Sequence, residues 1–93
     1  MTSTEGPAVL GLDGELDDPD AVRAAIEDAS EHYSRSLRVD LSAVTYLPSV
    51  VIGVLFGAMK QAEAAGTEVE VAVAPGTVVH SILLVTAMPH VTV

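Results

Sequence analysis

The chain has 93 residues, of which 49% are hydrophobic and 3% aromatic, and its 13 acidic and 4 basic side chains give a net charge of −9. This length suits one domain with an aliphatic core, and the negative charge disfavours nucleic acids and anionic membranes as partners because both are polyanions. The sequence has no cysteine, which excludes disulfides, thiolate chemistry and iron–sulfur clusters.

The chain begins with residues 1–7, which we interpret as a loose leader because they lack the basic start and apolar centre of a signal peptide. The apolar run Ala8–Leu12 predicts a short strand that ends at the turn signal Asp13–Gly14, and Glu15–Leu16 predicts a second short extended piece. The longest apolar run, residues 50–59, is shorter than the ~20 residues that span a bilayer. We therefore expect one cytoplasmic domain over residues 8–93, without membrane insertion.

The first predicted helix begins after Asp18, whose carboxylate suits the N-cap, with Pro19 at the first helical position. Apolar residues then recur at helical spacing and form one stripe, which comprises Val22, Ala25, Ile26 and Ala29. The alternation in Leu37–Leu41 predicts a strand, and residues 42–48 connect it to a second helix over Ser49–Ala65. Gly66 stands where a helix commonly ends in a left-handed residue.

The last third of the chain repeats this alternation. Val69–Val73 predicts a strand, Pro75–Thr77 opens a third helix that runs to about Val85, and Val91–Val93 predicts a final strand. Strands that alternate with helices favour a single α/β domain, with a largely parallel or mixed sheet on which the helices pack.

Several short segments together resemble the STAS domains of anti-sigma-factor antagonists. Gly14–Asp17 resembles their "GELD" segment, Val39–Leu47 their "DLS.V.Y.D" strand and loop, and Ile52–Leu55 the helix that follows. Gly66 and residues 78–84 also fit, so the resemblance covers roughly residues 8–93. It implies a mixed β-sheet of about four to five strands with helices packed on it, and the final helix common in that family is missing from this sequence.

The resemblance implies a non-enzymatic regulatory module that binds an anti-sigma factor with a GHKL-type serine kinase fold. Phosphorylation of a serine at the start of the second helix releases the partner in such proteins, and by position that serine is Ser49. The usual Asp-Ser-Ser-Gly-Leu-Gly motif reads here Pro48–Ser49–Val50–Val51–Ile52–Gly53. Two alternatives stay open for Ser49: a plain N-cap, or a cap that also accepts phosphate.

The start of the second helix is apolar on nearly every side, whereas a surface helix normally keeps one polar face. We therefore expect some of these residues to be exposed and to bind a partner. The predicted partner-binding residues are Asp17, Asp18, Pro48, Ser49, Val50, Val51 and Phe56. Gly53 and Gly57, four residues apart, are expected to pack against the sheet.

The sequence offers no pattern for catalysis, a cofactor or a metal. His32, His80 and His90 are scattered, and the acidic residues 13–20 lack the spacing of a calcium loop. The leading alternative function is a degenerate STAS subunit that binds a partner ATPase of the lipid-transport type without phosphorylation. Homodimerisation also stays open.

Overall fold

The computed structural model describes residues 8–93, so the predicted leader over residues 1–7 lies outside the described part of the chain. Strands and helices alternate through it, as the sequence predicts. In chain order they are β1 (Ala8–Glu15), α1 (Pro19–Ala29), β2 (Leu37–Tyr46), α2 (Ser49–Ala65), β3 (Val69–Val73), α3 (Val78–Val85) and β4 (Val91–Thr92).

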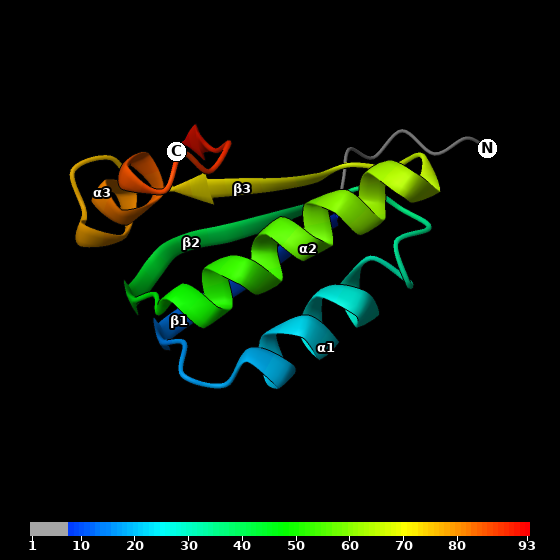
Figure 1. The fold of residues 1–93 in the computed structure, drawn as a ribbon, viewed down its shortest axis with the longest axis horizontal. Helices are drawn as coiled ribbons and strands as arrows, with labels where there is room; N and C mark the ends of the chain where they lie inside the picture. The colour runs from blue at the N-terminus through cyan, green and yellow to red at the C-terminus, as the bar shows by residue number, and fades with distance from the viewer. Residues whose placement is uncertain (1–7) are drawn as a thin grey trace.

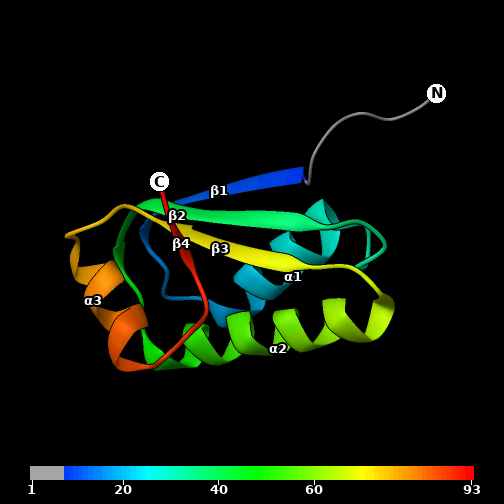
Figure 2. The ribbon, with the colours of Figure 1, turned by 90° about the horizontal axis from the view of Figure 1, so that it is seen from above.

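The four strands form one sheet in the order β1-β2-β3-β4, and each neighbouring pair is parallel. The sequence left a parallel or mixed sheet open, and the described strands make it parallel. Each strand is joined to the next by a helix, because parallel neighbours need a crossover connection. The three helices lie on one side of the sheet (Figure 2), and the carboxyl ends of the strands meet at a single edge.

The core lies between the sheet and the helices and is aliphatic, as the composition predicts. Alternate side chains of β2 and β3 point into it, including Val39 and Val71, because successive residues of a strand face opposite sides. Val22 and Ile26 bring the predicted stripe of α1 to the same core. The core residues of α2 follow the helical period and are Val51, Ile52, Val54, Leu55, Ala58 and Ala62.

Two strands are longer than predicted. The Asp13–Gly14 pair does not form a turn, because β1 continues through it to Glu15 alongside β2. The strand pairing shifts register there, and Gly14 has φ 69°, so the glycine permits an irregularity within the strand. β2 likewise continues from Leu41 to Tyr46 and replaces most of the predicted connection.

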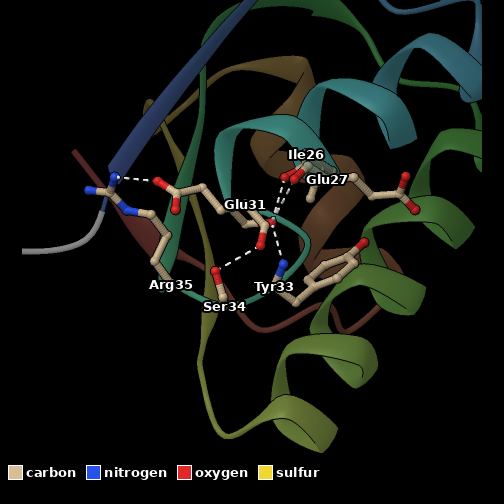
Figure 3. A network of polar contacts seen from close by, with 7 residues as sticks. Ile26, Glu27, Glu31, Tyr33, Ser34 and Arg35 are labelled. Carbon is tan, nitrogen blue, oxygen red and sulfur yellow. Dashed lines mark hydrogen bonds and ion pairs between the residues drawn. The ribbon is translucent and has the colours of Figure 1, made fainter.

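Backbone and side-chain hydrogen bonds together form the turn after α1, and Figure 3 shows its polar contacts. Ser30 is fully buried, and its hydroxyl donates to Ile26 O at 2.7 Å and accepts from Tyr33 N at 3.0 Å. Glu31, His32 and Tyr33 all have positive φ, which is costly for residues with a Cβ. This turn directs the chain back to the sheet, where β2 begins. None of the helices in residues 8–93 has the length and apolar character required to cross a membrane.

Candidate protein-binding site

The first turn of α2 follows the carboxyl end of β2. Pro48 is the N-cap, with φ −72° and ψ 157°, and the N–H groups of Val51 and Ile52 donate to its carbonyl at 3.0 and 3.1 Å. Ser49 is therefore the first helical residue, and its side chain is exposed. The prediction that Ser49 caps the helix is wrong, because the extended backbone of a cap is supplied by the proline ring one residue earlier.

α2 differs from the other helices at its start. Asp18 caps α1, with Oδ1 accepting from Asp20 N and Ala21 N at 3.1 and 3.2 Å, as predicted for that residue. Thr77 caps α3 by accepting from His80 N at 3.1 Å. Of the three helices in the described chain, α2 alone has no side-chain cap. Its first N–H groups are therefore left to solvent or to an anion.

The apolar residues at the start of α2 divide between surface and core. Val50 is 55% exposed and Phe56 is 36% exposed, whereas Val51 is 0% exposed. The expectation that some of the three are exposed is confirmed. Val51 faces the sheet, and no partner can contact its side chain while the domain is folded, so it does not belong to the docking surface.

Gly53 and Gly57 do not pack against the sheet, and the expectation that they do is wrong. Both are exposed, and a Cβ added at either would meet nothing within 4 Å. They line a shallow hollow of about 130 Å³ between α1 and α2, together with Arg23 and Tyr33. Neither glycine contributes a side chain to this hollow.

The acidic residues Asp17 and Asp18 lie at the same edge of the sheet as Ser49. Leu16 N donates to Tyr46 O at 3.2 Å, which joins the end of β1 to the end of β2. Asp17 follows the first of these residues directly, and Ser49 comes three residues after the second. Both aspartates are exposed and line a hollow of about 270 Å³ at the end of β1. The structure thus brings Asp17, Asp18 and the first turn of α2 to one end of the domain, with Val51 buried, whereas Phe56 lies about 10 Å further along α2.

Other exposed apolar residues at this end were not predicted. Tyr46 is 51% exposed at the end of β2, and α3, at the end of the molecule where α2 begins (Figure 2), exposes Val78, Leu84 and Val85. α3 has eight residues and only two of them are polar, so it is apolar on nearly every side. That composition was the available signal, because a helix lying on one face of a sheet cannot bury its whole circumference.

Residues 8–93 form no metal site. No group of three or more His, Asp or Glu residues in the described chain could hold a metal ion. His80 and His90 do meet, with ring centroids 5.3 Å apart, but their Nδ1 atoms are engaged by Gly76 N and Met88 O. What this end of the domain presents is an exposed hydroxyl beside apolar side chains with carboxylates nearby, which suits protein binding.

Comparison with known proteins gives one family and one fold. The family model described as Mlab, STAS domain, matches residues 1–92. The solved structure of the anti-sigma factor antagonist SpoIIAA in its unphosphorylated form is 19% identical, with a TM-score of 0.66 over 98% of this chain and 83% of that one. A candidate anti-sigma factor antagonist from Thermotoga maritima is 16% identical, with a TM-score of 0.60 over 91% of this chain and 79% of that one. A search of curated proteins finds no match.

Proposed function

The chain belongs to the STAS domain family, and we propose that it is a non-enzymatic, cytoplasmic protein-binding module of the anti-sigma-factor-antagonist type. Its docking surface is centred on the first turn of α2. The observation that carries this proposal is the exposure of Ser49 and Val50 on a helix whose next two residues are buried.

The apolar residues of this surface supply the attraction. Val50, Tyr46 and Phe56 are all exposed apolar side chains, in a chain whose net charge is −9. Covering such a residue contributes about 25 cal/mol for each Å² of apolar area removed from water. Asp17 and Asp18 lie at the edge of the surface and favour a partner that offers basic side chains there.

Ser49 supplies a means of release. A phosphate on its hydroxyl adds about −1.5 to −2 charges, and it stands beside the uncapped N–H groups of α2, which favour an anion. Because Ser49 does not cap the helix, modification breaks no capping bond, and the fold is preserved. The added charge stands beside exposed Val50, and covering it with a partner would remove its hydration, so the phosphate opposes the apolar contact that holds the partner.

The test uses an anti-sigma factor with a GHKL-type kinase fold encoded in the same genome, with ATP. We expect phosphate in the wild-type chain and none in Ser49→Ala. The matched control is Ser81→Ala, which removes another exposed hydroxyl, on α3, and should be labelled like the wild type. Equal labelling of the wild type and Ser49→Ala would contradict the assignment of Ser49.

A second candidate is a STAS subunit that binds a partner ATPase of the lipid-transport type without phosphorylation. Two observations favour it. The matching family model is described as Mlab, and Pro48, Val50 and Val51 stand in place of the residues that accompany the serine in antagonists. Affinity capture from the native cell separates the candidates, because recovery of a GHKL-type kinase supports the antagonist and recovery of an ABC ATPase supports the subunit.

A further inference from the structure

β3 has an open edge along its first half. β2 pairs with it from Val69 to Ala72, but β4 pairs only with Ala72 and Val73 on the other side. The sheet position next to Val69–Val71 is therefore empty in the described chain. Edge strands of this kind present unpaired backbone groups and are ready-made templates for another strand.

The hydrogen bonds identify which backbone groups are open. Leu37 N donates to Glu68 O at 2.9 Å, so Glu68 faces β2, and Val93 N donates to Val73 O at 3.0 Å, so Val73 faces β4. Successive residues of a strand alternate between its two edges, so Val69 and Val71 face the same side as Val73. The pairing of Ala72 with Val91 uses the Val71 carbonyl and the Val73 N–H. The N–H and C=O of Val69 and the N–H of Val71 are left over.

A hollow of about 440 Å³ lies in front of these groups. Its floor is the consecutive stretch Thr67–Val71, one wall is Met59 and Glu63 from α2, and the other is Pro89–Val91 at the start of β4. Five residues of extended backbone measure about 17 Å, which is room for a short segment in line with β4.

The negative charge of the groove favours a segment with basic side chains. Glu63, Glu68 and Glu70 line it together with His90, and neither Lys nor Arg does. The ion pairs among residues 8–93 engage Asp20, Glu31 and Glu70, which leaves Glu63 and Glu68 unneutralised within that part of the chain. A second copy of the chain would bring its own glutamates against these, so like charges oppose an edge-to-edge dimer.

We propose that the β3 edge binds an extended peptide segment in which basic and aliphatic residues alternate, added to the sheet as a strand. Its aliphatic side chains lie on the helix side of the sheet, near Met59. Its Lys or Arg side chains lie on the opposite side, where Glu70 pairs with Arg38 at 2.8 Å and Glu68 precedes it by two residues. Met59 is ten residues, or about 15 Å, along α2 from Ser49, so this site is separate from the docking surface and independent of the proposed function.

The test measures binding of the hexapeptide acetyl-Lys-Val-Lys-Val-Lys-Val-amide by calorimetry and by amide chemical shifts. We expect the largest shifts at Val69, Glu70 and Val71, and no binding of the Glu-Val counterpart. Two isomers of the peptide, N-methylated at every Lys or at every Val, separate strand pairing from charge attraction. Only one edge of the added strand faces β3, so one isomer should bind and the other should not. Equal binding of both isomers would overturn the proposal.

Two protein variants complete the test with equal changes in net charge. Glu68→Lys should weaken the peptide at least about fivefold, because it replaces an attraction by a repulsion. Asp28→Lys, at an exposed position on α1, should change the affinity less than about twofold. Equal weakening by both variants, shifts centred outside the groove, or a dimer of the free chain that protects the Val69 and Val71 amides from exchange would each overturn the proposal.

Discussion

Two adjacent valines of α2 should respond oppositely to the same substitution. Val50 is 55% exposed and Val51 is 0% exposed, yet both lie in the first turn of one helix. Replacing a fully buried valine by alanine removes two methylene equivalents, or about 1.6 kcal/mol of transfer free energy, and leaves a cavity in addition. Val51→Ala should therefore lower the free energy of unfolding by about 2 kcal/mol, with unchanged affinity of the folded chain for its partner.

For Val50→Ala the same quantity divides between folding and binding. Val50 is already a little less than half buried in the folded chain, so its truncation should lower folding stability by about 0.7 kcal/mol of the transfer free energy. The better helix propensity of alanine offsets about 0.5 kcal/mol of that loss. The remainder, about 0.9 kcal/mol, is available only when a partner covers the residue, and it corresponds to a four- to fivefold weaker Kd. The free energy of unfolding should change by less than about 0.5 kcal/mol.

The assays are urea denaturation followed by circular dichroism, and calorimetric titration with the captured partner. Loss of affinity greater in Val51→Ala than in Val50→Ala would refute the division of this helix into a docking side and a core side. So would equal losses of stability in the two variants.

Four further variants test the local structure by urea denaturation. Asp18→Ala should lower the free energy of unfolding by about 1 kcal/mol because it removes the cap of α1. Ser49→Ala should change it by less than about 0.5 kcal/mol because Ser49 is not a cap. Equal losses of stability in these two variants would contradict the assignment of the caps. His32→Gly should stabilise the chain by about 0.5–1 kcal/mol, because His32 has φ 58° at an exposed position; a loss would show that the turn depends on the imidazole. The Ser42 N–H donates to Asp40 Oδ1 at 2.9 Å and lowers the pKa of that carboxyl in the folded chain. The contribution of this bond to the free energy of unfolding is therefore fully present above the pKa of an unfolded aspartate, about 4, and is lost as the pH falls below that value through the folded pKa. Asp40→Asn should accordingly lose less stability than the wild type between pH 5 and pH 2, and parallel pH profiles would count against this bond.

The helices could be predicted because their signals are local. Asp18, Pro19 and Gly66 mark helix ends through the chemistry of one turn, and α1 begins and α2 ends as these residues indicate. The strands were less predictable because their lengths depend on pairing with residues far along the chain. The Asp13–Gly14 pair has a local preference for a turn, but β2 pairs alongside it and the strand continues.

In the predicted site, too, some features could be predicted and others depend on the folded structure. The resemblance to STAS domains places Asp17 and Ser49 on one surface, and in the structure both lie at the edge where the carboxyl ends of β1 and β2 meet. Which valine faces the core depends on the rotation of α2 about its axis, and an apolar pattern on all sides does not indicate that rotation. The N-cap prediction failed because Ser49 and Pro48 are both acceptable at a helix start, and only the backbone distinguishes them.

The central claim is that a protein partner docks on the first turn of α2. Mapping amide chemical shifts of the labelled chain on addition of the unlabelled partner tests it most directly. We predict the largest changes at Ser49, Val50 and Phe56, with smaller ones at Asp17. Changes confined to α1 or to the face of the sheet opposite the helices, with Ser49 and Val50 unmoved, would contradict it.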